Sequence, residues 1–159
     1  MTGMQASALI AGLDPGSSKC GLVLADSSQG QVLEAAILPP PASQGLLQAW
    51  QQRGLARVIL GNGTGSHTWR PLLRQLNLEL TLVDERGSSL AARQRYWELD
   101  PPNPWMRLLP TGLRLPPRDI DDVVAQLLLE RWLGEPLQRR NGEVLRQWPP
   151  NGFKNGPAP

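Results

Sequence analysis

The chain has 159 residues, of which 40% are hydrophobic and 19% are charged, and its formal net charge is +2 at pH 7. This length and balance predict one globular domain that buries a core of its own. The single cysteine excludes an internal disulfide framework and any zinc site built from several cysteines. No stretch reaches the roughly 18 apolar residues of a membrane span. With no signal-peptide pattern in the first residues, we expect a cytoplasmic protein without a membrane partner.

The first predicted element is a hairpin of two apolar strands on either side of Asp14-Pro15-Gly16. Proline presets one backbone dihedral and glycine tolerates the positive one, so this pair marks a tight turn. A carboxylate at the end of a buried strand is costly unless it is paired, hydrogen-bonded or metal-bound. The simpler interpretation is a turn aspartate that bonds its own backbone. Residues 31–38 add a third strand and complete an antiparallel meander.

Helices and strands alternate in the middle of the chain. Ser43 is a candidate N-cap for a helix to about Arg53, and residues 57–60 form a short apolar run typical of a buried parallel strand. A helix over about residues 68–76 and a strand over residues 79–83 continue the alternation. The glycine-rich segment 61–67 is either a ligand-contacting loop or a mobile connection, and it lacks the lysine of a P-loop.

A second acidic segment, Asp84-Glu85-Arg86, follows the strand over residues 79–83 and precedes a helix from Ser88 to about Glu98. Ligands of open α/β sheets gather outside the carboxyl ends of strands, so chemistry is expected here. The proline-rich residues 99–117 predict a long irregular excursion.

The last predicted helix runs from about Asp119 to Leu133. Helical spacing predicts one buried face for it, formed by Val123, Val124, Leu127, Leu128 and Trp132. Its first turn carries three acids, more than capping requires: Asp119, Asp121 and Asp122. We therefore expect a domain over residues 1–133 and a polar, partly disordered tail over residues 134–159.

The motifs of three acidic segments resemble one protein family. Gly12-Leu13-Asp14-Pro15-Gly16-Ser17 is similar to the first-strand motif of RuvC resolvases, and Val83-Asp84-Glu85-Arg86 resembles the Asp-Glu-Arg motif of the YqgF (RuvX) branch. Ile120-Asp121-Asp122, followed by an apolar helix, looks like that branch's closing acidic motif. The resemblance covers residues 9–133 and implies a ribonuclease H-like α/β fold. This fold has a mixed five-stranded sheet, three antiparallel meander strands followed by parallel ones, flanked by helices.

The resemblance further implies a metal-dependent nuclease with Asp14, Glu85 and Asp121 or Asp122 as catalytic residues. With Asp119 as a further candidate, these acids would hold one or two Mg²⁺ or Mn²⁺ ions, since hard cations take oxygen ligands. The ions would serve phosphodiester hydrolysis. The substrate would be a structured nucleic acid, either a four-way DNA junction or a ribosomal RNA precursor. A homodimer would suit a two-fold symmetric junction.

Arginine and lysine neutralise backbone phosphates, and glycine-rich loops can approach phosphates closely. The candidate nucleic-acid contacts near these acids are therefore Lys19, Arg86, Arg93, Gly63 and Thr64. Trp69 and Trp105 are candidates for base stacking, and Trp50, Trp97 and Trp132 for the core. Two alternatives remain open. One is a catalytically inactive ribonuclease H-like binding module, and the other is an ATP-binding domain of the actin and sugar-kinase type, which normally needs a second domain.

Overall fold

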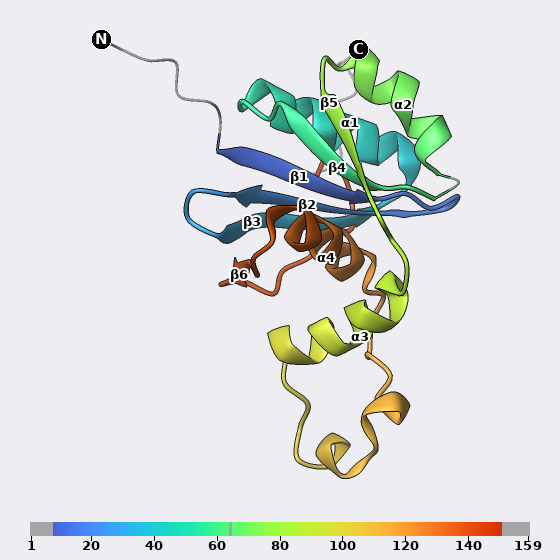
Figure 1. Ribbon diagram of the computed structural model, residues 1–159, viewed down its shortest axis with the longest axis vertical. Helices are drawn as coiled ribbons and strands as arrows, with labels where there is room; N and C mark the ends of the chain where they lie inside the picture. Colours follow the sequence, from blue (N-terminus) through green and yellow to red (C-terminus); the bar gives the residue numbers. More distant parts are fainter. Residues whose placement is uncertain (1–7, 64, 151–159) are drawn as a thin grey trace, which may run out of the picture.

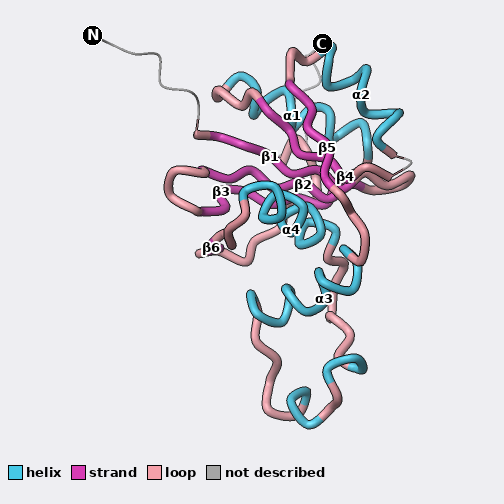
Figure 2. Tube along the Cα trace, in the orientation of Figure 1, coloured by secondary structure: helices cyan, strands magenta, loops and turns pink. Residues whose placement is uncertain are grey.

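The computed structural model describes residues 8–63 and 65–150, and a six-stranded mixed sheet forms its centre (Figures 1 and 2). Strands β1 (Leu9–Asp14), β2 (Cys20–Asp26) and β3 (Gln31–Leu38) form the predicted antiparallel meander. β4 (Arg57–Gly61) lies parallel to β1, and β5 (Glu79–Val83) lies parallel to β4. The order β5-β4-β1-β2-β3, with only β2 reversed among these strands, is that of the ribonuclease H-like fold. The predicted fold class is therefore confirmed.

The sheet has six strands rather than the predicted five, because the chain returns to the edge of β3. The short strand β6 (Gln138–Arg139) pairs parallel with β3, and Leu145 exchanges backbone hydrogen bonds of 2.8 and 2.9 Å with that strand. Leu137 is fully buried, and Leu145 and Trp148 pack against the core. Residues 134–150 therefore lie against the sheet, whereas the division of domains at residue 133 stays a prediction. Their few apolar residues have no periodicity that would reveal this packing.

Helices cover both faces of the sheet. One face carries α1 (Pro40–Gln52) and α2 (Ser66–Gln75), which enclose a core around Leu47, Trp50 and Leu73. The other face carries α4 (Asp121–Leu133), and α3 (Ser88–Leu99) packs on α4 (Figure 1). Because α4 lies between the sheet and α3, even its polar residues Gln126 and Glu130 are buried. None of the helices in the described ranges is long and apolar enough to cross a membrane.

Three helices begin away from their predicted residues, and one of them, α2, begins at Ser66 rather than at about residue 68. α1 begins at Pro40 rather than Ser43, because proline is tolerated in a first turn, where its missing N–H is not needed. Ser43 lies inside α1, and its hydroxyl donates to the carbonyl oxygens of Pro39 at 2.9 Å and Leu38 at 3.2 Å. α4 begins at Asp121, so Asp119 lies in the segment before the helix.

The tryptophans divide differently from the prediction. Trp50 is buried in the core as expected, but Trp132 is 38% exposed and lies under the Arg57 guanidinium, 5.4 Å from its carbon. Trp69 is 3% exposed and is unavailable for base stacking, whereas Trp105 is 80% exposed. The expectation for Trp132 was wrong because α4 lies between the sheet and α3. The buried residues of α4 therefore lie on two sides of the helix, not on the single stripe that helical periodicity predicts.

Residues 100–117 form an arm that projects beyond α3 (Figure 1). The arm contains two short 3₁₀ turns, η1 (Met106–Leu108) and η2 (Thr111–Leu113), and is otherwise irregular, as predicted. The guanidinium of Arg114 donates hydrogen bonds of 3.0 Å to three carbonyl oxygens of the arm. The Trp97 indole N–H donates to the Arg114 carbonyl at 3.0 Å. These bonds give the arm a fixed shape and anchor it to α3.

Candidate functional site

Three acidic side chains surround one point at an edge of the sheet. Asp14 ends β1, Glu85 follows β5, and Asp121 begins α4. Because β1, β4 and β5 are parallel, their carboxyl ends meet at this edge. Asp14 lines one cavity of about 520 Å³ together with Glu85, and a second of about 370 Å³ together with Asp121. The structure thus brings these three predicted residues together around Asp14.

The charges at this point oppose one another. The pKa of Asp14 is raised from 3.8 to about 7, first by burial and then by the negative charges of Asp121 and Glu85. Both causes disfavour the ionised carboxylate, and a bound cation would reverse the second of them. The site therefore has an excess of negative charge that a positive ligand would neutralise.

Glycines of the loop between β4 and α2 make room for Glu85. A Cβ atom at Gly61 or Gly63 would overlap the Glu85 carboxylate. The backbone N–H of Glu85 donates to the side-chain oxygen of Asn62 at 3.4 Å. Gly63 was predicted as a nucleic-acid contact, and here it lines the cavity beside Glu85 and leaves space for it. Thr64, predicted for the same role, lies outside the described residues.

Two further glycines set the position of α4. Gly21 is the partner of Asp14 in the ladder between β1 and β2, and a Cβ atom there would overlap the backbone carbonyl of Asp121. A Cβ atom at Gly12 would likewise overlap the carbonyl oxygen of Ala125. The helix backbone approaches the hairpin this closely only because glycine has no side chain. Asp121 is therefore held near Asp14 by direct packing of main-chain atoms.

The basic residues predicted for this site differ in their surroundings. The ammonium nitrogen of Lys19 lies 2.7 Å from Asp119 and 3.5 Å from Asp121. The hydrogen bond with Asp119 raises the pKa of Lys19 and lowers the pKa of Asp119. Arg93 lines the same cavity as Asp14 and Asp121, whereas Arg86 is 93% exposed and 3.9 Å from Asp84. Lys19 thus supplies part of the counter-charge for Asp121.

Asp122 has a different role from the one predicted. Its side chain is fully buried, Oδ1 accepts from Arg118 at 2.8 Å, and Oδ2 accepts from Arg139 at 2.7 Å. Successive residues of a helix point about 100° apart, so Asp121 and Asp122 cannot both face Asp14. The prediction of Asp122 as a catalytic residue and metal ligand is therefore corrected, because both carboxylate oxygens are occupied by arginines.

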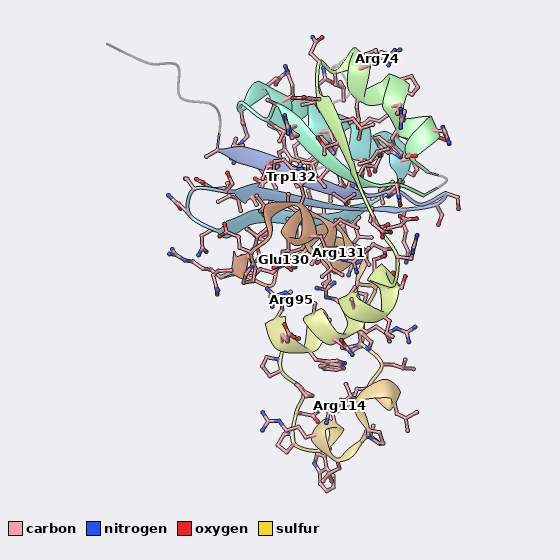
Figure 3. The ribbon with its side chains drawn as sticks, viewed as in Figure 1. Arg74, Arg95, Arg114, Glu130, Arg131 and Trp132 are labelled. Atoms are coloured by element: carbon pink, nitrogen blue, oxygen red, sulfur yellow. The ribbon has the colours of Figure 1, made fainter. Side chains whose placement is uncertain are left out.

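Sequence reasoning missed the arginines that hold the interior of this region. Arg118 stands four residues before Asp122 but lies outside both the predicted helix and α4, so helical spacing did not signal their pair. Arg139 gave no signal either, because its contact with Asp122 forms only when β6 joins the sheet. Arg95 of α3 forms an ion pair of 2.8 Å with Glu130 of α4. Both residues are labelled in Figure 3.

The side chains around Asp14 are carboxylates, the kind of ligand that Mg²⁺ and Mn²⁺ take. Within residues 8–63 and 65–150, no group of three His, Cys, Asp or Glu side chains has the geometry to hold a metal ion. The donors nevertheless agree in kind, because carboxylate oxygens are the ligands these ions prefer. Burial, followed by the negative charges of Asp121 and Glu85, raises the pKa of Asp14, and a cation would relieve the repulsion among these charges.

Comparisons with known proteins were made for the whole chain. No protein-family model and no curated protein matches it. Among solved structures, it is similar to T. thermophilus RuvC in complex with a Holliday junction substrate. The two chains share 16% sequence identity with a TM-score of 0.43, over 78% of this chain and 95% of that chain.

Proposed function

We propose that this protein is a metal-dependent nuclease that hydrolyses phosphodiester bonds in structured nucleic acid. The observation that carries the proposal is the position of Asp14, a half-buried carboxyl whose pKa is raised to about 7 between Glu85 and Asp121. A purely structural site gains nothing from three acids that destabilise one another. A strongly perturbed group in a cavity is typical of a functional site. The motifs around these three acids, which resemble those of RuvC-like proteins, support the same proposal.

In this proposal Asp14, Glu85 and Asp121 hold one or two Mg²⁺ or Mn²⁺ ions. Bound ions of this kind activate water and stabilise the oxygens of a phosphodiester displacement. Asp14 would have to be ionised to serve as a ligand. Lys19, at 2.7 Å from Asp119 and 3.5 Å from Asp121, would supply counter-charge to these two acids. Arg93, on the wall of the same cavity, neutralises a phosphate of the substrate.

The proposed substrate is a branched DNA, such as a four-way junction, or a structured RNA such as a ribosomal RNA precursor. Both present phosphodiesters outside a continuous duplex, and the basic side chains near Asp14 are compatible with either. A homodimer would place two such sites on a two-fold symmetric junction, and it stays a prediction. The cytoplasmic location and the roles of Arg86 and Thr64 also stay predictions.

The test is cleavage of labelled four-way DNA junction, duplex DNA and structured RNA with Mg²⁺ or Mn²⁺, by wild type and Asp14→Asn. Asp26→Asn is a matched control, because Asp26 ends the antiparallel strand β2 and bonds the nearby Ser28. The proposal expects metal-dependent cleavage by wild type and by Asp26→Asn, with a loss of at least about 100-fold in Asp14→Asn. Equal activity of wild type and Asp14→Asn would refute it.

One observation favours a second candidate, an inactive nucleic-acid-binding module. Lys19 lies within 3.5 Å of Asp121 and 2.7 Å of Asp119, so a side chain already neutralises part of the acidic set. A folded wild type that binds structured nucleic acid equally well with and without Mg²⁺, and cuts none of the three substrates, would establish that candidate instead. Calorimetric titration of Mg²⁺ into the protein separates the two, since the module needs no metal.

A further inference from the structure

A separate cavity of about 280 Å³ lies behind Arg118, between α3, the beginning of α4 and the segment after β6. Three arginines line it, Arg118, Arg139 and Arg140, together with Tyr96 and Asp100. Arg118 also lines the cavity that contains Asp14 and Asp121. The two cavities therefore share one wall. This second cavity contains none of the acids assigned to the proposed catalytic site.

Arg139 has a nitrogen atom that the protein leaves without an acceptor. Its side chain is 5% exposed, its Nη1 donates to Asp122 at 2.7 Å, and its Nε donates to the Gln126 side chain at 3.0 Å. Its Nη2 is buried and has no hydrogen-bond partner, the one such side-chain atom in the described part of the chain. A buried donor without an acceptor is unfavourable, because it has lost its water and gained nothing in return.

The charges that line this cavity do not balance. Asp122 accepts from both Arg118 and Arg139, and Asp100 accepts from the Tyr96 hydroxyl at 3.0 Å. Arg140 is exposed, and no described side chain forms an ion pair or hydrogen bond with it. Three guanidinium groups thus line the cavity with a single carboxylate, Asp100, while Asp122, which is not part of the lining, pairs with two of them. The excess positive charge lies with Arg140 and the unpaired nitrogen of Arg139.

We propose that this cavity binds a phosphate group. A tetrahedral oxyanion offers several acceptor oxygens at once, and guanidinium groups bind phosphate through paired N–H donors. It would supply the missing acceptor of Arg139 and the missing counter-charge of Arg140. A water molecule would satisfy Arg139 alone and leave the charge of Arg140 unbalanced.

The phosphate has two possible sources, the end of a nucleic-acid strand or free phosphate and nucleotides. The shared wall favours the strand end, because Arg118 lines both the cavity of Asp14 and the cavity of Arg139 and Arg140. This choice of source rests on the proposed nuclease function, whereas the binding of a phosphate group in the cavity is independent of that function.

The first experiment titrates inorganic phosphate into the metal-free full chain by calorimetry, with sodium chloride at matched ionic strength as the blank. The test variant is Arg140→Ala, because Arg140 has no partner whose loss would disturb folding. Arg74→Ala is the matched control, since Arg74 is an exposed arginine on α2 at the opposite end of the molecule (Figure 3). We expect saturable binding by wild type and Arg74→Ala, and an affinity at least about 10-fold lower in Arg140→Ala.

Absence of saturable binding by wild type would overturn the proposal, and so would equal affinity of wild type and Arg140→Ala. Arg139→Gln provides an independent check. It removes the unpaired nitrogen, and thermal unfolding shows whether the variant has folded. A folded Arg139→Gln protein that binds phosphate like wild type would also overturn the proposal.

The second experiment distinguishes the sources in the Asp14→Asn background, where the proposed cleavage is absent. Single strands with a 5′-phosphate, a 3′-phosphate or hydroxyl ends are compared by fluorescence anisotropy. A preference of about 10-fold for one terminal phosphate, lost with Arg140→Ala, assigns the cavity to the strand end. Equal binding of all strands, with inorganic phosphate still bound at Arg140, assigns it to free phosphate. Failure of the nuclease proposal would leave the calorimetric result unchanged, so the two proposals can fail separately.

Discussion

Replacement of Asp14 by asparagine is expected to stabilise the metal-free protein, and more strongly as the pH rises. The pKa of this carboxyl is about 7 in the folded protein and 3.8 without the fold. At a pH between these two pKa values, the folded state holds a proton that the unfolded state has lost. The free energy of unfolding therefore falls as the pH rises. Asparagine has no such proton and escapes the loss.

The magnitude follows from the two pKa values. Linkage gives a loss of about 2 to 3 kcal/mol for wild type between about pH 5 and about pH 8, almost all of it below pH 7. For a chain of this size, that corresponds to a difference in melting temperature of about 5 to 10 °C. The advantage of Asp14→Asn over wild type should grow by this amount across the same interval.

The assay is thermal unfolding of wild type, Asp14→Asn and Asp26→Asn in chelator, at several pH values between these limits. Asp26 is exposed, and its hydrogen bonds with Ser28 lower its pKa, so the Asp26→Asn difference should stay constant over this range. Mg²⁺ should restore wild type toward Asp14→Asn at the upper pH, because a cation favours the ionised carboxylate. A pH-independent difference between wild type and Asp14→Asn would refute the electrostatic argument.

Three further substitutions test the construction of the site. Gly63→Ala should reduce cleavage by at least about 10-fold while the far-UV circular dichroism is unchanged, because the new Cβ displaces the Glu85 carboxylate; full activity would contradict this role. Asp122→Ala should lower the free energy of unfolding in urea by about 3 to 5 kcal/mol, because it leaves buried arginine charge unpaired; a loss below about 1 kcal/mol would show that the pairs are not needed. Gly21→Ala should cost about 2 kcal/mol or more in the same assay, since its Cβ meets the α4 backbone, and a neutral result would mean that α4 shifts freely.

Local patterns predicted most of the sheet. The apolar runs of residues 31–38 and 79–83 gave the bounds of β3 and β5 as the structure has them, because turn residues end both runs abruptly. The Asp-Pro-Gly turn correctly placed Asp14 at the end of β1. Asp14 and Glu85 meet because parallel strands bring their carboxyl ends to one edge, and that topology could be inferred from the alternation of strands and helices. Asp121 joins them through the packing of α4 on Gly21.

What escaped prediction depends on contacts between distant segments. The pairing of Arg139 with Asp122, and the addition of β6 to β3, join residues far apart in the chain. Asp121 and Asp122 are chemically alike in the sequence, and only the rotation of α4 against the hairpin gives one to the site and the other to the interior. The glycines of residues 61–65 suggested a flexible loop, whereas two of them leave space for Glu85.

The contact of α4 with Gly12 and Gly21 has a consequence for how this protein tolerates change over evolution. Main-chain atoms of α4 lie against both glycines, so backbone contact sets the distance between Asp14 and Asp121 there more than the size of a hydrophobic side chain does. Exchanges among leucine, isoleucine and valine elsewhere in the core would alter stability while the two acids keep their spacing. Chains with very different interiors could therefore share this arrangement of acids, provided that both glycines are retained.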